Sequence, residues 1–475
     1  MSTTRQIEND FFKSALAKGA TVSSVPLILE WIKSKSSAMK TRIEPIPLER
    51  MRSWRFDEAS GDIVHESGRF FSIEGIRVET DWGLVSRWEQ PIINQPEIGY
   101  LGIIAKKIDG ILHFLMQAKI EPGNINRVQL APTIQATKSN CTRVHQGKVP
   151  LFLEYFNGER PVTIRVNQLQ SEQGARFLRK RNCNMIVEVP EKEPLPVPDD
   201  FIWATLGQLK ELIRHDNVVN MDTRTVLSGI PFGSYVGHAG ESGPAAEHAG
   251  DHDRHFLRSL LDPENHLHDL DRIISWITGL KMRYHLRVTR LPLREIKGWE
   301  YNGGSIRHQD GKYFSVIGVD VEIGNREVQQ WTQPMIQPMQ EGIMAFIVKP
   351  IGGVYHFLVQ AKLEAGNFDV LELAPTVQCL TGNYRTGKNE YAVPFIDAVL
   401  GAKKERIGYS ALQSEEGGRF YQEQNRNMII EAEPGFPIAV PDNYCWMTLN
   451  QLSTFIKFNN YLNIAARSLI AAVSF

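Results

Sequence analysis

The amino-acid sequence contains two diverged copies of one unit, and this repeat limits the possible folds more than any other feature. HFLMQAKIEPGN, which begins at His113, returns as HFLVQAKLEAGN at His356, 243 positions later. The pairs LAPTIQAT and LAPTVQCL, and LQSEQGARF and LQSEEGGRF, share this offset. The register stays free of gaps from Trp88 to Asn220, which convergent patterning does not explain. The chain is therefore predicted to hold two homologous domains in tandem.

The predicted domain borders follow from the repeat and from one stretch that breaks it. Each copy begins with an amphipathic helical segment, VPLILEWIKS around Trp31 and LDRIISWITG around Trp276. Residues 236–255 are rich in glycine, alanine and histidine and lack apolar periodicity, which is typical of a flexible linker. We expect a first repeat at 1–235 and a second at 256–475. The irregular spacing of the linker histidines favours adventitious over specific metal binding.

Local patterns predict an α+β fold for each copy, with a mixed β-sheet and flanking helices. An Asp-Gly pair at 109–110 and a Gly-Gly pair at 352–353 each separate two apolar runs, as in β-hairpins. GRFFSIEGIRVET, from Gly68, predicts a strand, a turn and a second strand. TLGQLKELIRHDN, from Thr205, has apolar residues at helical spacing. The residues at 170–182 predict a short helix that leads into a strand.

Composition and charge exclude several classes of function. The chain has 53 basic and 54 acidic residues, so no net field attracts nucleic acids or membranes. The four cysteines form no CxxC pair, which favours a reducing compartment. The N-terminus lacks a signal-peptide pattern and no window reaches 18 apolar residues, so we expect a cytoplasmic protein. GxGxxG, Walker-loop, HExxH and nucleophile-elbow patterns are missing, so we expect neither a metal nor a cofactor.

A stripe of polar residues follows one face of the strand HFLMQAKIEPGN. Gln117, Lys119 and Glu121 alternate with apolar residues at the period of a β-strand. The stripe has two interpretations, a solvated face with cross-strand ion pairs or the floor of a polar pocket. The second copy repeats it, and a Gly-Asn pair that could bring the backbone close to a ligand follows each stripe; the further residues are Asn124, Gln360, Lys362, Glu364 and Asn367. This recurrence favours the pocket.

A second polar motif lies about fifty residues further on in each copy. Ser171 is placed to cap the short helix predicted at 170–182, with Arg176 one turn in. A helix start beside an arginine suits a diphosphate, although an ordinary cap with a surface arginine fits the same pattern. The motif also includes Gln170 and Glu172, and its second-copy members are Gln413, Ser414 and Arg419.

Aromatic and histidine residues add further candidates. Trp88 and Trp331, each followed by x-Gln-Pro, are either core tryptophans or a wall on which a base stacks. His65 and His308 each precede a turn, and either acid–base chemistry or a structural hydrogen bond explains them.

Four strings together resemble a known enzyme family. QAKIEPGN, LAPTIQATKSN, LQSEQGARF and RNCNM, with their second-copy partners, are similar to the nucleotide-diphosphate-hexose 2,3-dehydratases of deoxysugar biosynthesis. The resemblance covers nearly the whole chain, including the duplication and the helix before each copy. It implies Nudix-like halves. The region 170–182 has Glu172 but no REx2E, so metal-dependent pyrophosphate cleavage is not expected.

The resemblance also implies an activity and partners. Members of this family remove the C2 hydroxyl of a thymidine-diphosphate-linked 4-keto-6-deoxyglucose as water, giving a 3,4-diketo-2,6-dideoxy sugar for antibiotic biosynthesis. A downstream NAD(P)H-dependent 3-ketoreductase would consume the product, no cofactor is needed, and a homodimer is implied. A non-catalytic nucleotide-sugar scaffold and, less well supported, a Nudix-type hydrolase are the alternatives.

The elimination requires a base, an acid and a group that stabilises an enolate. We assign the base to Glu121 or His65 and the stabilising charge to Lys119, while a Lys119–Glu121 salt link without a catalytic role is the alternative. The remaining candidates named in the first copy are predicted to bind substrate. We expect the first copy to be catalytic because its Gln129 and Gln173 are Glu372 and Glu416 in the second, where added carboxylates would repel a diphosphate.

Overall fold

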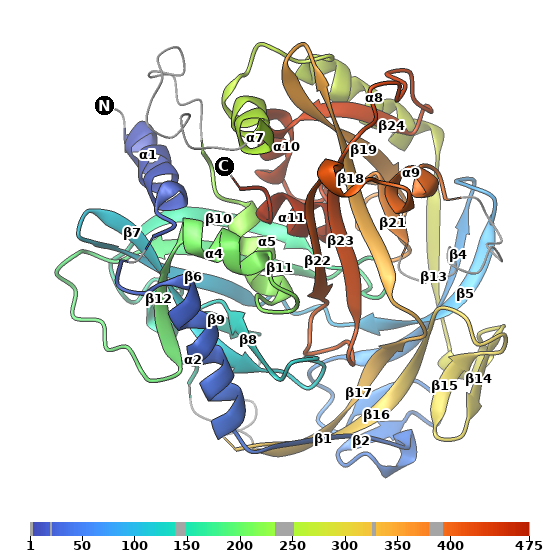
Figure 1. Ribbon diagram of the computed structural model, residues 1–475. Coiled ribbons are helices and arrows are strands. Elements are labelled where there is room, and N and C mark those ends of the chain that lie inside the picture. The colour runs from blue at the N-terminus through green and yellow to red at the C-terminus, as the bar shows by residue number, and fades with distance from the viewer. Residues whose placement is uncertain are drawn as a thin grey trace.

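The computed structural model describes most of the chain, namely residues 3–19, 21–137, 149–232, 251–324, 329–379 and 393–474. It contains two halves of similar construction, each built on one large mixed sheet with helices against it (Figure 1). The predicted α+β fold is confirmed, whereas the Nudix-like character stays a prediction. In the described residues, no helix is long and apolar enough to cross a membrane.

Each half contains a seven-stranded sheet with the same strand order. β6 and β11 run parallel in the first half, as do β18 and β23 in the second, and the other neighbours are antiparallel. The first sheet has the order β10 (Thr163–Ser171), β11 (Arg181–Glu188), β6 (Tyr100–Ile108), β7 (Ile111–Ile120) and β12 (Phe201–Thr205), with β8 (Val128–Ala131) on β7 and β9 (Ile134–Ala136) on β6. The second has the order β22 (Ile407–Ser414), β23 (Gln424–Glu431), β18 (Gly342–Ile351), β19 (Val354–Lys362) and β24 (Tyr444–Thr448), with β20 (Glu372–Ala374) on β19 and β21 (Val377–Cys379) on β18.

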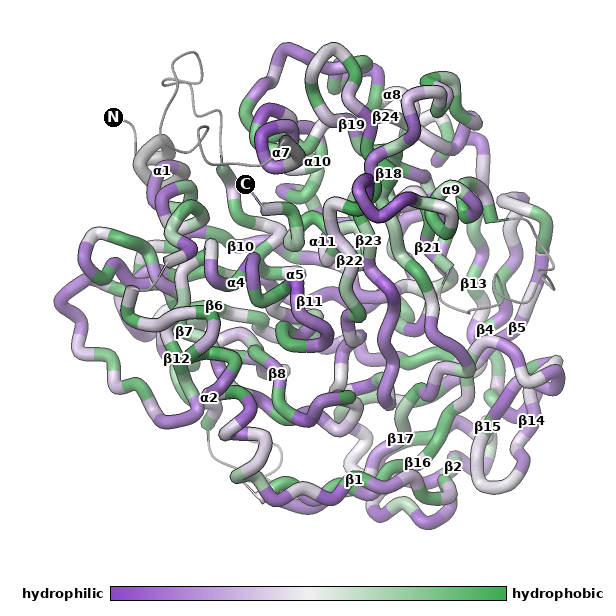
Figure 2. The backbone as a smooth tube through the Cα atoms, in the orientation of Figure 1, coloured by the Kyte–Doolittle hydropathy of each residue, from purple (hydrophilic) through white to green (hydrophobic). Residues whose placement is uncertain are grey.

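The helices bury apolar faces against these sheets, and Figure 2 shows hydrophobic and hydrophilic stretches interleaved along both halves. The helices predicted around Trp31, Trp276 and after Thr205 are confirmed. The α-helices are α1 (Thr3–Leu16), α2 (Val25–Ala38), α4 (Leu206–Ile213), α5 (Met221–Ser228), α7 (Asp251–Leu261), α8 (Leu270–Arg283), α9 (Ile396–Leu400), α10 (Leu449–Ile456) and α11 (Ile464–Ala471). Short 3-10 turns are η1 (Leu48–Arg50), η2 (Leu153–Tyr155), η3 (Leu293–Glu295) and η5 (Lys404–Arg406).

Two smaller five-stranded sheets each combine strands from both copies. β1, which precedes the first copy's own sheet, pairs antiparallel with β16 of the second copy, and β13 pairs in the same way with β4 of the first (Figure 1). One sheet holds β1 (Thr41–Ile46), β14 (Trp299–Asn302), β15 (Ser305–His308), β16 (Phe314–Ile323) and β17 (Gln330–Pro338). The other holds β2 (Trp54–Phe56), β3 (Ile63–His65), β4 (Ser72–Thr80), β5 (Arg87–Asn94) and β13 (Leu286–Leu291). The copies are therefore linked through exchanged strands.

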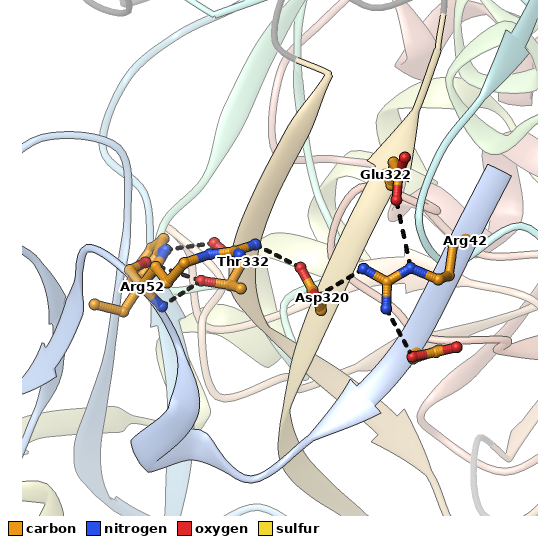
Figure 3. Close-up of polar contacts among 7 residues, drawn as sticks. Arg42, Arg52, Asp320, Glu322 and Thr332 are labelled. Atoms are coloured by element: carbon orange, nitrogen blue, oxygen red, sulfur yellow. Dashed lines mark hydrogen bonds and ion pairs between the residues drawn. The ribbon is translucent and has the colours of Figure 1, made fainter. Parts of the chain in front are cut away.

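Polar contacts fasten the exchanged strand β1 and the segment after it to the second copy (Figure 3). Asp320 accepts from Arg52 at 2.6 Å and from Arg42 at 3.3 Å. The Arg52 N–H donates to the Thr332 hydroxyl at 2.7 Å, and the Trp54 indole donates to the Thr332 carbonyl at 2.8 Å. Exposed ion pairs of this kind add little stability, so the strand ladder and the buried indole carry most of the attachment.

Some of the turns predicted from the sequence are present in the structure, and one is not. The hairpins are confirmed, with left-handed φ angles of 52° and 77° at Asp109 and Gly110. The turn predicted within GRFFSIEGIRVET is wrong, because β4 runs through Gly75 without a break. A Cβ at Gly75 would lie 2.6 Å from Ile296 Cγ2 and 2.8 Å from the Leu291 carbonyl oxygen. The glycine allows β13 and the segment after it to pass close to β4. It does not mark a turn.

The predicted linker lies mainly outside the described residues. Residues 251–255 belong to α7, and 236–250, with their histidines, are not described. Among the described residues, no group of three or more His, Cys, Asp or Glu side chains is placed to hold a metal ion.

We predict that Gly75→Ala lowers the free energy of unfolding by about 2 kcal/mol, because the added methyl overpacks the crossing between β4 and the exchanged segment. Urea denaturation followed by tryptophan fluorescence measures this shift. Gly279→Ala is the matched control, since a Cβ there meets nothing within 4 Å and helix α8 should gain about 0.5–1 kcal/mol. Equal effects of both substitutions would contradict the crossing argument.

Candidate active site

The Gly-Asn turns after β7 and β19 meet the other half of the molecule. The Gly123 N–H donates to the Gly417 carbonyl at 2.7 Å, and a Cβ at Gly123 would lie 1.6 Å from the Phe420 carbonyl oxygen. Gly366 makes the equivalent contact with the turn at 174–177. The sequence predicted that the backbone of these turns lies close to a ligand. The structure places it against the backbone of the other half.

Asn124 and Asn367 belong to these turns. The Asn124 amide donates to the carbonyls of Arg127 at 2.9 Å and Lys119 at 3.4 Å, which closes the turn on itself. Both asparagines are buried, and the Oδ1 atom of each lacks a hydrogen-bond partner among the described residues.

The short helix predicted at 170–182 is wrong. β10 ends at Ser171, a turn follows, and β11 begins at Arg181. The main chain of this turn bonds to other segments: the Arg179 N–H donates to Gly366, and the Arg176 carbonyl accepts from Ile93. Since these groups are satisfied outside a helix, the predicted cradle at a helix N-terminus is missing.

The turn at 172–180 and its counterpart at 415–423 are called the crossing turns. Each crossing turn carries its side chains to the pocket of the other copy. Gln173 donates to Glu415 of the second copy at 3.1 Å. Burial lowers the pKa of Arg176, and the carboxylates of the second copy, Glu423 first, oppose this shift. In the same way, burial lowers the pKa of Arg419, which is opposed by Glu416 and by Glu121 of the first copy.

Two clusters of polar side chains result, related by the repeat and each drawn from both copies, and we call them the first and the second pocket. The first pocket contains Lys119, Glu121, Gln135, Glu172, Lys180 and Asp222 of the first copy with Glu416 and Arg419 of the second. The second pocket contains Lys362, Glu364, Gln378, Glu415 and Glu423 of the second copy with Gln173 and Arg176 of the first.

The stripe of β7 forms one side of the first pocket. Lys119 Nζ lies 3.8 Å from Glu121 Oε1, which also accepts from Gln135 at 2.8 Å. Glu121 Oε2 is buried and lacks a hydrogen-bond partner among the described residues. The ion pair named as the non-catalytic alternative is thus present, and it leaves one carboxylate oxygen available to accept a proton.

The two carboxylates of Glu121 and Glu416 converge on Gly418. A Cβ at Gly418 would lie 3.3 Å from Glu416 Oε1 and 3.6 Å from Glu121 Oε1. Burial, together with Glu172 and Glu121, raises the pKa of Glu416 to about 7, although Arg419 and Lys180 act against the shift. Burial and the same carboxylates, Glu416 foremost, raise the pKa of Asp222 well above its usual range. Such clusters are a mark of proton-transfer sites.

The second pocket differs from the first at four equivalent positions, one of which has Ala465 in place of Asp222. Gln173 stands where the first pocket has Glu416, Ala175 where it has Gly418, and Glu423 where it has Lys180. Both oxygens of Glu423 lack a hydrogen-bond partner among the described residues, and burial raises its pKa to about 7.

The two pockets also differ in accessibility. The side chains of Gln173, Arg176 and Gln378 in the second pocket are buried, with exposures of 2%, 6% and 7%. Their counterparts in the first pocket, Glu416, Arg419 and Gln135, are half-buried. A ligand can therefore reach more polar atoms in the first pocket.

The expectation that Glu416 faces the second copy's own pocket is wrong, because its turn places it in the first pocket. Glu372, the other added carboxylate, accepts a hydrogen bond from Ser171 at 3.0 Å at the contact between the halves. The greater accessibility of the first pocket and the presence of Lys180 there are the features that favour it as the catalytic one.

The tryptophan motifs support the arginine-bearing turns. The Trp88 indole donates to Gln90 at 2.9 Å, and Gln90 donates to the Ala175 carbonyl at 3.1 Å. Trp331 and Gln333 repeat this relay to Gly418, with distances of 2.9 and 2.7 Å. Of the two interpretations, the packing role matches these contacts.

His65 and His308 lie on the five-stranded sheets. The ring of His65 packs on Trp54 with centroids 5.2 Å apart, and its Nδ1 is 2.7 Å from the Ser67 hydroxyl oxygen. His308 packs on Trp299 in the same way at 5.4 Å. These contacts fit the structural alternative.

The remaining predicted residues occupy the surroundings of the pockets. Gln170 and Gln413 donate to main-chain carbonyls of the other half, both at 2.6 Å. Gln360 donates to the Pro375 carbonyl at 2.9 Å, Ser414 donates to Gln129 at 2.9 Å, and Gln117 is half-buried on β7.

Four residues of the first pocket were not among the sequence candidates: Gln135, Lys180, Asp222 and Glu416. Gln135 lies in the repeated string LAPTIQAT, and the change of Gln173 to Glu416 was visible in the alignment of the copies. Lys180 and Asp222 differ in type from their counterparts, Glu423 and Ala465, so the repeat gave no signal for them.

Comparisons with known proteins agree on one family. A family model described as NDP-hexose 2,3-dehydratase matches residues 26–230 and 270–473. A protein of Saccharopolyspora spinosa is 47% identical, covering 93% of this chain and 90% of that protein. Proteins of Streptomyces violaceoruber and Amycolatopsis orientalis are 43% and 41% identical, covering 93% and 98% of this chain and 95% and 94% of those proteins. All three bear the name dTDP-4-dehydro-6-deoxy-alpha-D-glucopyranose 2,3-dehydratase.

We predict that Glu372→Gln makes the folded chain more stable, and increasingly so as the pH rises. Burial, with Glu364 nearby, raises the pKa of Glu372 to about 7. A carboxyl whose pKa is raised on folding favours the folded state at low pH and loses that contribution as the pH rises through the folded pKa. The gain in unfolding free energy should grow by about 2 kcal/mol between pH 5 and pH 8.

Urea denaturation at several pH values measures this gain. Glutamine fits the position, since Gln129 accepts the equivalent hydrogen bond from Ser414 in the first copy. Glu58→Gln, at an exposed carboxylate, is the control. A difference between wild type and Glu372→Gln that stays constant with pH would count against the assigned cause.

Proposed function

The chain belongs to the NDP-hexose 2,3-dehydratase family, and we propose that it removes water across C2 and C3 of a dTDP-linked 4-keto-6-deoxyglucose. The product is a 3,4-diketo-2,6-dideoxy sugar. The names of the three relatives support this substrate. One observation carries the proposal: in the first pocket, Lys119 lies beside Glu121, whose Oε2 atom lacks a hydrogen-bond partner among the described residues.

The residues of the first pocket suit the first half of this reaction. The C4 ketone acidifies the C3 proton, which we assign to Glu121 Oε2 as base. The pair of electrons left at C3 forms an enolate with the C4 carbonyl, and the charge of Lys119 stabilises its oxygen. Return of these electrons expels the C2 hydroxyl and leaves a C2–C3 double bond. The enol at C3 then passes its proton to C2 and becomes the ketone.

Substrate binding extends the proposal to the cations of the same pocket. Arg419 takes the role that the sequence gave to Arg176, because the crossing turns exchange the two arginines. Its guanidinium stacks on the Phe71 ring at 4.1 Å and donates to Gln95 at 3.1 Å, which fixes its direction. Lys180 adds a second positive charge, and both suit a diphosphate.

The proposal includes partners and a setting. A 3,4-diketone is reactive, so a downstream NAD(P)H-dependent 3-ketoreductase is expected to consume it. A homodimer follows from the resemblance alone, and light scattering would test it. Three described cysteines, Cys183, Cys379 and Cys445, are free thiols, which fits a reducing cytoplasm.

The test is an assay with thymidine-diphosphate-4-keto-6-deoxyglucose, a 3-ketoreductase and a reduced nicotinamide cofactor, without added metal. Mass spectrometry should find the loss of one water followed by the gain of two hydrogens. Substrate that binds without turnover would replace this proposal with the scaffold alternative. Magnesium-dependent release of a sugar phosphate would favour the hydrolase.

We predict that Lys119→Met lowers kcat by about 10²–10³-fold in this assay, since the enolate loses its stabilising charge. Lys362→Met is the matched control, because it removes the equivalent lysine from the second pocket and should keep kcat near the wild-type value. A larger loss from Lys362→Met would transfer the reaction to the second pocket.

A further inference from the structure

We propose that Glu416, which the second copy contributes to the first pocket, is the general acid that protonates the departing C2 hydroxyl. This inference rests on the proposed dehydration and adds the residue that the reaction still lacks. The sequence offered no acid for this step, and the side chain comes from the copy that was not expected to catalyse.

The position of Glu416 near the proposed base is the first support. The carboxylates of Glu416 and Glu121 approach the same point beside Gly418, at 3.3 and 3.6 Å from the place of a Cβ. The two residues come from different copies, and their carboxylates meet beside this glycine. An elimination needs this arrangement, in which one group takes a proton from C3 while another delivers one to the C2 oxygen.

Hydrogen bonds hold the main chain around Glu416 in place. Its carbonyl accepts from the N–H groups of Arg419 and Phe420, both at 3.0 Å, and the Arg419 carbonyl accepts from Ile336 at 2.9 Å. The relay from Trp331 through Gln333 ends on the next carbonyl, that of Gly418. The backbone that carries the acid is therefore ordered before substrate arrives.

The charges around Glu416 keep a proton available near neutral pH. Glu172 and Glu121 face it and disfavour its ionised form, as burial does, while Arg419 and Lys180 favour that form. Asp222, whose pKa is also raised, completes the cluster. A pKa of about 7 suits a group that gives up a proton in one step and recovers it before the next.

The proton balance closes within the pocket. Glu121 gains the C3 proton, and Glu416 loses its proton to the hydroxyl, which leaves as water with the electrons of the C2–O bond. Transfer of the proton from Glu121 to Glu416, directly or through solvent, restores both groups. Their approach beside Gly418 provides a short path for this transfer.

The second pocket provides a natural comparison. Its equivalent of Glu416 is Gln173, and an amide does not supply a proton to a leaving group. Its equivalent of Gly418 is Ala175, which adds a methyl group at this position. The second pocket thus keeps the base-bearing strand and lacks the acid.

Glu416→Gln tests the acid, because it gives the first pocket the side chain of the second. With the natural substrate we expect kcat to fall by about 10²–10⁴-fold. With the 2-deoxy-2-fluoro analogue, which releases fluoride without needing a proton, we expect a loss of less than about threefold. Glu416→Asp keeps an acid and should recover part of the activity on the natural substrate.

Controls separate this inference from the proposed function. Glu372→Gln, the same change at the other position where the copies exchange Gln for Glu, should leave both rates near wild type. Equal losses on the natural and fluorinated substrates, or retained dehydration by Glu416→Gln, would overturn the role of Glu416. A wild-type chain that releases neither water nor fluoride would instead overturn the proposed dehydration itself.

Discussion

The contact between Gly123 and the Phe420 carbonyl, with its counterpart at Gly366 and Phe177, sets the spacing on which both pockets depend. A Cβ at either glycine would lie 1.6 or 1.7 Å from the opposing carbonyl oxygen, so a larger residue would force the halves apart. Buried arginines reinforce the same contact. Arg224 donates to the Ser414 carbonyl at 2.7 Å, and the equivalent arginine of the second copy binds the first copy in the same way. Because the halves meet through main-chain atoms, the side chains of each crossing turn project into the pocket of the other copy.

The repeat predicted much of the local structure because local structure depends on nearby residues. The helix after Thr205 has its capping box and apolar period in one short segment, and the hairpin at 109–110 needs only its two turn residues. Such local patterns do not predict strand exchange between the copies. β1 and β13 are equivalent strands of the two copies, so either one satisfies the alternation of β4 or β16, and nothing local distinguishes pairing within a copy from pairing between copies.

In the candidate site, too, the features that depend on nearby residues were predicted and those that depend on the other copy were not. Lys119 and Glu121 were predicted as neighbours because a strand places alternate residues on one face, and they form an ion pair. Ser171 was mistaken for a helix cap because its hydroxyl donates to Glu372 of the other copy, a partner that one segment of the sequence does not include. Glu416 was visible as a difference between the copies, but its pocket was assigned by chain continuity. In a duplicated protein, the copy that encodes a side chain and the copy that uses it can differ.

The asymmetry of the two pockets follows from how their buried ionisable groups are satisfied. Burial lowers the pKa of Lys180 in the first pocket, while Glu172 and the Glu97 carbonyl favour its charged form, which attracts a diphosphate. At the equivalent position the second pocket has Glu423, whose oxygens lack hydrogen-bond partners among the described residues and whose pKa rises to about 7. A buried carboxyl without partners lowers its energy by taking up a proton, which leaves that site neutral. The same arrangement of strands and turns therefore places a lysine in one pocket and, at the equivalent position of the other, a carboxyl with a raised pKa.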